Sequence, residues 1–152
     1  MCWSNARAMS NAPVHVLVHA PAPLVWELWA HPALWDTWHP EVRQARMLGP
    51  SDGGMGFLRD DERWMPFRIT PINSGVAFTV ETRPLPELTL VFTCTLIAVE
   101  SGCVAAQSVH LEGRFSEAFE EPICDFVSAR SRQALDYLRD LAEFLNEVTS
   151  SD

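Results

Sequence analysis

The sequence contains no lysine, because all eleven basic residues among its 152 residues are arginines. Schiff-base chemistry on a lysine is therefore excluded, and so is a phosphate-binding P-loop, which requires a lysine. The sequence also lacks an apolar run long enough to span a bilayer. Residues 1–12 contain no continuous apolar segment, so we expect a disordered N-terminal tail there rather than a signal peptide.

Basic charge is scarce, since 20 acidic residues outnumber the 11 arginines and give a net charge of −9. An acidic surface repels a phosphate backbone, and nucleic-acid binding generally needs a basic stripe. We therefore expect no nucleic-acid partner, and anionic membrane surfaces are disfavoured too. Ten of the acidic residues lie in residues 112–152, where they are typical of the solvated face of a helix.

The four cysteines show no C-x-x-C spacing, so neither a zinc site nor a redox motif is indicated. Cys94 and Cys103 flank a predicted hairpin whose register separates them, which disfavours a disulfide. His15 and His19 would lie roughly 13 Å apart on a strand, too far to chelate one ion. Dinucleotide-binding, nucleophile-elbow and zinc-protease motifs are also absent. We expect free thiols in a reducing cytoplasm, with no metal and no cofactor.

The hydrophobic pattern predicts the element order β-α-α-β-β-β-β-β-β-α. Strands are predicted where apolar residues alternate between turn signals, over residues 14–18, 42–48, 55–59, 63–72, 76–82, 88–99 and 103–111. Pro21 suits the first turn of a helix, and the His31-Pro32 pair ends that helix before a short second one. Apolar residues at helical spacing predict a long amphipathic helix over residues 120–148. Consecutive strands with segregated helices indicate an α+β domain, a single one over residues 13–148.

Three segments carry a resemblance to a known family: P-A-P-L-V-W-E-L at 21–28, W-D-T-W-H-P at 35–40, and S-G-C-V-A-A-Q-S-V-H-L-E-G at 101–113. Together with the long helix, they resemble the START-like superfamily, often called SRPBCC. It includes polyketide cyclases and dehydrases, the birch-pollen-allergen family and lipid-transfer domains. The resemblance covers residues 14–148. It implies a helix-grip fold, in which a curved antiparallel sheet wraps around the long C-terminal helix and leaves a deep pocket, with two short helices after the first strand.

Strand alternation predicts which side chains face that pocket. When one face of a sheet packs on a helix, every second side chain of each strand is buried. The inward residues are Val76, Phe78, Val80 and Thr82; Leu88, Leu90, Phe92, Cys94 and Leu96; and Ala105, Gln107, Val109 and Leu111. The predicted ligand-binding residues are Trp38, His39, Phe57, Phe67, Phe78, Phe92, Gln107 and Arg130. No catalytic residue is assigned. A mainly apolar lining with few polar groups is typical of small-molecule sites.

The polar members of this set have two interpretations each. Gln107 either satisfies neighbouring groups or meets a ligand. Arg130 pairs with a carboxylate, which we favour, or anchors an acidic ligand group. His39 either has a structural role beside its proline, which we favour, or acts as an acid or base. Trp35 and Trp38 are interpreted as packing residues.

Three hypotheses for function follow. The first is a protein that binds a small hydrophobic or aromatic molecule, of the lipid, polyketide-like or isoprenoid class, between sheet and helix. The second is an enzyme resembling the polyketide cyclases and dehydrases, in which orientation supplies much of the acceleration. The third is an interaction module of the co-chaperone type, which predicts an exposed apolar patch rather than a cavity. We favour binding. The oligomeric state stays open, with a homodimer as one alternative.

Overall fold

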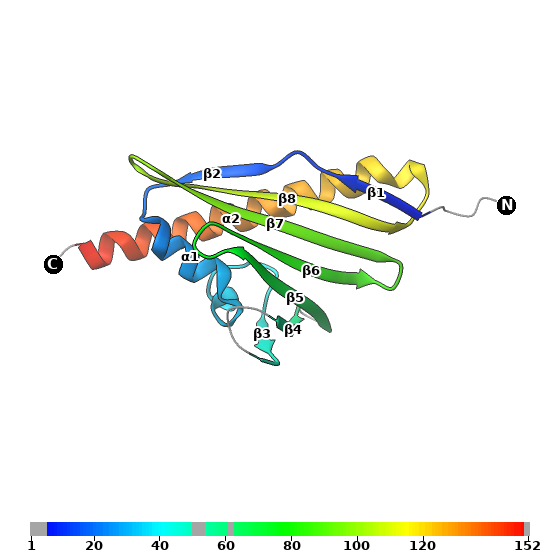
Figure 1. Cartoon of the computed structure of the whole chain (residues 1–152), viewed down its shortest axis with the longest axis horizontal. Helices are drawn as coiled ribbons and strands as arrows, with labels where there is room; N and C mark the ends of the chain where they lie inside the picture. Colours follow the sequence, from blue (N-terminus) through cyan, green and yellow to red (C-terminus); the bar gives the residue numbers. More distant parts are fainter. Residues whose placement is uncertain (1–5, 50–53, 61–62, 151–152) are drawn as a thin grey trace.

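The computed structural model describes residues 6–49, 54–60 and 63–150. These residues form one antiparallel sheet and a long C-terminal helix (Figure 1). The strands are β1 (Ala6–Ser10), β2 (Val14–Val18), β3 (Gln44–Met47), β4 (Gly54–Arg59), β5 (Trp64–Asn73), β6 (Ala77–Leu85), β7 (Leu88–Val99) and β8 (Gly102–Arg114). The helices are α1 (Ala22–Ala30), the 3-10 helices η1 (Pro32–Thr37) and η2 (Glu117–Phe119), and α2 (Glu120–Ser150). The predicted α+β class and helix-grip arrangement are confirmed.

The sheet runs in the order β1-β8-β7-β6-β5-β4-β3, and β2 pairs with the same edge of β8 further along that strand. The β7–β8 hairpin turns at Gly102, which has φ +151°. A side chain at this position would clash with the carbonyl oxygen of Val18, so both the backbone conformation and the space require glycine. This hairpin places the two longest strands side by side, with β8 next to the edge strands β1 and β2.

The prediction of a disordered tail over residues 1–12 is wrong for Ala6–Ser10, which form β1 and pair with β8 between His110 and Arg114. Asn11 joins β1 to β2 by exchanging two hydrogen bonds with Val109. Its N–H donates to the Val109 carbonyl at 3.0 Å, and its side-chain oxygen accepts from the Val109 N–H at 2.7 Å. Residues Ala6–Ser10 lack strong apolar alternation, and their strand is ordered mainly by backbone pairing with β8. Residues 1–5 lie outside the described part of the chain.

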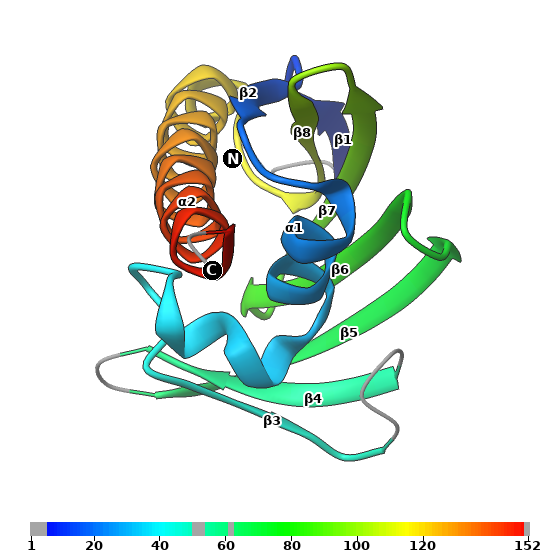
Figure 2. The same ribbon diagram turned by 90° about the vertical axis from the view of Figure 1, so that its left-hand side faces the viewer.

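Helix α2 lies on the concave side of the curved sheet, together with α1 and η1 (Figure 2). Its buried stripe faces the sheet and contains Val127, Ser131, Ala134, Leu135, Leu138 and Ala142. The apolar interior forms two clusters. The larger one surrounds α1, η1 and the C-terminal half of α2, and the smaller one surrounds Val109, Leu111 and Val127. Phe92 packs against both clusters, so it lies at the level where the interior changes from one to the other.

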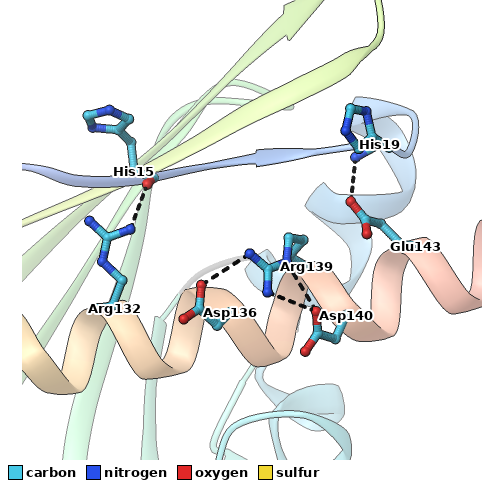
Figure 3. A network of polar contacts seen from close by, with 7 residues as sticks. All are labelled: His15, His19, Arg132, Asp136, Arg139, Asp140 and Glu143. Atoms are coloured by element: carbon cyan, nitrogen blue, oxygen red, sulfur yellow. Dashed lines mark hydrogen bonds and ion pairs between the residues drawn. The ribbon is translucent and has the colours of Figure 1, made fainter.

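Polar contacts attach α2 to β2 and the residue after it on the side of the helix that faces this strand (Figure 3). The Glu143 carboxylate accepts a hydrogen bond from the His19 backbone N–H at 2.8 Å, and Arg132 donates to the His15 carbonyl at 3.3 Å. The two imidazoles lie at opposite ends of the strand in Figure 3 and do not converge. Among the described residues, no cluster of three or more potential metal ligands occurs. These contacts hold the helix over the sheet without entering the space between them.

The remaining differences from the predicted elements are local. The second helix is a 3-10 helix, and α2 extends to Ser150. Val76 does not face inward: it lies in the turn before β6, is 43% exposed and donates its N–H to the Asn73 carbonyl. The described cysteines are free, and Cys94 and Cys103 have different partners across the β7–β8 hairpin. Cys2 lies outside the described residues. No described helix is both long and apolar enough to cross a membrane.

Candidate functional site

A cavity of about 1010 Å³ lies between the concave face of the sheet and α2, and it is closed at one end by α1 and η1. The lining is predominantly aromatic and aliphatic. Its apolar members are Trp29, Trp35, Trp38, Pro40, Val42, Leu58, Met65, Phe78, Val80, Pro84, Leu85, Leu88, Leu90, Phe92, Pro122, Ile123, Phe126, Val127, Ala134 and Leu135. Its polar members are His39, Glu41, Asp60, Arg63, Thr82, Cys94, Gln107, Arg130 and Ser131.

The tryptophans of the end wall present apolar surface because their N–H groups are used elsewhere. The last carbonyls of α1 have no partner within the helix. Trp35 Nε1 donates to the Trp29 carbonyl at 2.8 Å, and Trp38 Nε1 donates to the Leu28 carbonyl at 2.9 Å. These two bonds cap the helix and lock both indole rings. The end wall is therefore rigid, and its indole donors are already satisfied.

Phe78 of β6 forms part of the cavity wall and is held between two tryptophans of α1. Its ring lies 5.4 Å from the rings of Trp26 and of Trp29, and both contacts are edge-to-face. Aromatic pairs favour this geometry, since the positive edge of one ring meets the negative face of the other. Phe78 is only 1% exposed, so its position is fixed by packing. The inward parity predicted for this strand places Phe78, Val80 and Thr82 on the cavity side, as found.

Gln107 lies opposite Cys94 across β7 and β8, and both side chains line the cavity. Gln107 Nε2 donates to Cys94 Sγ at 3.4 Å. Burial raises the pKa of the Cys94 thiol to about 12, and the hydrogen bond from Gln107 offsets only part of this effect. The thiol is therefore protonated near neutral pH and is no nucleophile there, because the thiolate is the reactive form. Of the two interpretations of Gln107, the first is present, because its amide group satisfies a neighbouring side chain, and the residue also lines the cavity.

Ser131 is the buried polar residue of α2 on the cavity wall. The residue is 4% exposed, and its hydroxyl has no hydrogen-bond partner among the described residues. A buried hydroxyl without a partner is uncommon and costs free energy comparable to a lost hydrogen bond. Thr82 on β6 is also buried, at 6% exposed. The deep part of the wall therefore contains neutral hydrogen-bonding groups and no charged side chain among the described residues.

His39 lies where η1 leads into the following loop, and its half-buried ring lines the cavity. Desolvation lowers its pKa from 6.5 to about 4, so the ring is neutral at pH 7. Its Nδ1 accepts a hydrogen bond from the Glu41 N–H at 3.2 Å, which requires an unprotonated Nδ1 and leaves the proton on Nε2. The ring also lies against Trp38, with 5.3 Å between ring centroids. These contacts match the structural interpretation and leave one N–H available.

Arg130 sits at the rim of the cavity rather than in its interior. Its guanidinium pairs with the Glu41 carboxylate and stacks over Phe126, with Cζ 4.6 Å from the ring centroid. Both members of the ion pair are substantially exposed, so solvent screens their attraction. The pair links α2 to the loop after η1. A second arginine, Arg63, donates to the Pro84 carbonyl at 2.8 Å on the sheet side of the rim.

Six of the eight predicted ligand-binding residues line the cavity: Trp38, His39, Phe78, Phe92, Gln107 and Arg130. The structure does not bring Phe57 or Phe67 to it. Phe57 pairs with Pro66 on the outer face of the sheet and is 39% exposed. Phe67 points inward, but Gly56 and the Trp35 ring, 5.3 Å away, enclose it in the core at 2% exposed.

Ser131 is a buried polar site residue that the sequence did not lead us to predict. The signal was present, because Val127, Ser131, Ala134 and Leu138 follow helical spacing. Arg130 was placed on this stripe instead, one position away from the residue that the helix actually buries. The rim residues Glu41 and Asp60 carried no periodic signal, since both lie in loops.

A serine, a histidine and a glutamate are also hydrogen-bonded in a row on the opposite side of the sheet. Ser10 Oγ lies 2.9 Å from His110 Nδ1, and His110 Nε2 lies 2.9 Å from Glu112 Oε1. Ser10 and Glu112 are exposed, and none of the three residues lines the cavity. The row joins β1 to β8 and is adequately explained as a cross-strand contact that orders the N-terminal strand.

The fold and the cavity between its sheet and long helix define a helix-grip protein of the START-like superfamily. The model of the family described as "Polyketide cyclase / dehydrase and lipid transport" matches residues 9–143, and the chain belongs to this family. No protein of curated function matches the sequence at a significant level.

Solved structures share the fold at low sequence identity. The structure of Ara h 8.0201 has a TM-score of 0.71 and 11% identity, with 91% of this chain and 98% of that chain covered. A START superfamily protein from Mycobacterium smegmatis has a TM-score of 0.62 and 12% identity, with 93% and 98% covered. The di-domain ARO/CYC BexL from the BE-7585A biosynthetic pathway has a TM-score of 0.64 and 21% identity, with 91% of this chain and 50% of that chain covered. At these identities the likeness concerns the fold alone.

Proposed function

We propose that this protein binds a small hydrophobic or aromatic molecule, of the lipid, polyketide-like or isoprenoid class, in the cavity between the sheet and α2. One observation carries the proposal: a cavity of about 1010 Å³ whose wall is mostly apolar and whose indole N–H groups at Trp35 and Trp38 are satisfied internally. A molecule without many polar groups gains most from such a wall. Small-molecule sites typically occupy roughly 300–1,000 Å³, so there is room for several fused rings or a folded chain.

The ligand-binding residues of the proposal are Trp38, Phe78, Phe92, Gln107 and Ser131, all of which line the cavity. The aromatic residues supply contact area, and the two polar residues supply orientation. His39 and Arg130 belong to the rim, where they border the route of entry. The ion pair between Arg130 and Glu41 supports a rim role for Arg130 over the anchoring of an acidic ligand group.

Native mass spectrometry of freshly purified protein, followed by extraction of bound compounds, tests the proposal. We expect an apolar compound bound at near one-to-one ratio, or uptake of one member of a panel of apolar compounds. Ala134→Phe narrows the cavity from α2, and Ala129→Phe adds the same ring to the exposed side of the same helix. Binding should weaken in the first variant and persist in the second. Equal binding by both folded variants would contradict the proposed location.

A cyclase or dehydrase reaction in the same cavity is the second candidate, because an ionisable side chain, His39, lines the cavity with its Nε2–H free of a described partner. A catalytic acid or base works best when its pKa lies near the operating pH. A pKa of about 4 makes His39 a weak base, which favours binding over catalysis. Conversion of a poly-β-carbonyl chain by the wild-type protein, lost in His39→Asn, would reverse this preference.

The co-chaperone type of interaction module receives less support, because that hypothesis expected an exposed apolar patch in place of a cavity. The proposed location is the cytoplasm, where a reducing environment suits the free thiols of Cys94, Cys103 and Cys124. No nucleic-acid partner is proposed, in keeping with the net charge of −9.

A further inference from the structure

We propose that Ser131 and Gln107 form a polar pair deep in the cavity that receives the hydroxyl group of an otherwise apolar ligand. The inference rests on the proposed function, since it names the chemical class of the molecule that the cavity holds. It predicts a neutral alcohol or phenol in preference to a plain hydrocarbon or a carboxylate. Three features support it: the unpartnered hydroxyl of Ser131 on α2, Gln107 on the sheet that α2 covers, and the absence of a charged side chain among the buried described residues.

Ser131 is nine-tenths buried, at 4% exposed, and its Oγ has no partner among the described residues. A serine in a helix commonly donates to the carbonyl one turn earlier, as Thr149 does to Leu145 at 2.8 Å. Ser131 makes no such bond, and the residue is one of those that line the cavity. A buried hydroxyl in this state is left to be satisfied by whatever enters the cavity.

The contacts on the N-terminal side of Ser131 fix the position of α2 along strand β8. Ser128 Oγ accepts a hydrogen bond from Asn11 Nδ2 at 2.9 Å, and Asn11 Oδ1 accepts from the Val109 N–H at 2.7 Å. Val127 packs in one cluster with Val109. The turn of α2 at residues 127–128 is therefore level with Val109 of β8.

The contact on the C-terminal side completes the alignment. Arg132 donates to the His15 carbonyl at 3.3 Å, and His15 is paired with Ala106 of β8 (Figure 3). Ser131 lies between these two tie points on the helix, and Gln107 lies between them on the strand. Both residues line the cavity, Ser131 from the helix and Gln107 from the sheet, and the same two tie points flank both of them.

Gln107 supplies the complementary hydrogen-bonding role. Its amide nitrogen donates to Cys94 Sγ at 3.4 Å, which orients the side-chain oxygen as an acceptor. The Ser131 hydroxyl can donate. A ligand hydroxyl satisfies both residues at once, because it accepts from Ser131 and donates to Gln107, whereas a ketone oxygen can only accept.

The charges around the cavity exclude a carboxylate from the deep position. Arg130 is directed to Glu41 and Phe126 at the rim, and Arg63 is bound to the Pro84 carbonyl. The buried part of the described wall offers no cation. An ionised group placed there would lose its hydration without an opposite charge, which is strongly unfavourable.

Three pyrene probes of nearly equal shape test the proposal: pyrene, 1-hydroxypyrene and 1-pyrenecarboxylate. A fixed trace of each probe is titrated with wild-type protein, Ser131→Ala, Gln107→Leu and the control Ser128→Ala, whose hydroxyl contacts Asn11 outside the cavity lining. We expect wild-type protein to bind 1-hydroxypyrene roughly five- to tenfold tighter than pyrene, the size of one or two net hydrogen bonds. This ratio should fall to about one in Ser131→Ala and Gln107→Leu, and stay unchanged in Ser128→Ala. The carboxylate should bind no tighter than pyrene.

The outcomes separate the two proposals. Equal affinities of pyrene and 1-hydroxypyrene for the wild type, or a preference that survives Ser131→Ala, would overturn the polar pair while leaving the apolar site standing. Failure of every probe to bind the wild type would overturn the proposed binding function, and the pair with it. Thermal unfolding without any probe gives an independent check. Ser131→Ala should unfold at the same or a higher temperature, because it removes an unpartnered hydroxyl, and a clear decrease would mean that this hydroxyl already has a partner.

Discussion

Replacing His39 with asparagine should remove a specific part of the pH dependence of stability. The asparagine Oδ1 can accept the Glu41 N–H in place of Nδ1, but the side chain does not titrate. In the folded protein, desolvation lowers the His39 pKa to about 4 from the ordinary value of 6.5. At a pH between these two values, His39 is mostly protonated in the unfolded chain and mostly neutral in the folded protein. The contribution of His39 is therefore fully present above pH 6.5 and is lost as the pH falls toward 4.

The size of this effect follows from the two pKa values. A difference of one pKa unit corresponds to about 1.4 kcal/mol, so the full loss approaches about 3 kcal/mol, and about 2 kcal/mol is lost by pH 5. The ring is still partly exposed, which makes these values upper limits. Urea unfolding of wild type and His39→Asn at pH 8 and pH 5 measures the difference, and the titration of the carboxylates common to both proteins cancels. The wild type should lose up to about 2 kcal/mol more than the variant. The same loss in both proteins would refute a desolvated, neutral His39 and would remove the argument that it is a weak base.

Two further predictions concern the cavity wall and the sheet. Cys94, with a pKa raised to about 12, should resist alkylation by iodoacetamide at pH 8 in the folded protein, while half-buried Cys124 reacts faster. Peptide mass mapping measures the labelling of each cysteine. Preferential labelling of Cys94 would contradict its buried, neutral state. Gly56→Ala should destabilise the protein by about 1–3 kcal/mol in chemical unfolding, because the added methyl group would clash with the Arg46 carbonyl oxygen and with the Phe67 ring. Gly49→Ala, with open space around it, is the matched control, and equal effects at both glycines would contradict the close packing around Gly56.

Much of the fold was predictable because local patterns and tertiary burial agree. Strand parity placed Phe78, Phe92 and Gln107 on the cavity side, and each lines the cavity. The alternation of side chains predicts the cavity side correctly on β6, β7 and β8, because successive side chains of a long strand with a fixed register point to opposite faces of the sheet. It fails for Val76, which lies just outside its strand, where the turn sets the direction of the side chain.

Other features depend on tertiary contacts that a single sequence does not reveal. β1 forms because the edge of β8 offers unpaired backbone groups and Asn11 bridges the break between β1 and β2. Phe67 has the inward parity of a ligand-binding residue, yet Gly56 and Trp35 fill the space around it. The unpartnered state of Ser131 was equally out of reach, since it depends on the absence of neighbours rather than on the residue itself.

The central claim is that an apolar ligand occupies the space between the sheet and α2, and fluorine NMR of protein labelled with 5-fluorotryptophan tests it most directly. Trp29, Trp35 and Trp38 line the cavity, whereas Trp64 does not line it and is 42% exposed on β5. During titration with 1-hydroxypyrene, the resonances of the three cavity tryptophans should shift saturably while that of Trp64 stays unchanged. A saturable shift of Trp64 with no change at Trp29, Trp35 and Trp38 would contradict the account, because the ligand would then be bound outside the cavity.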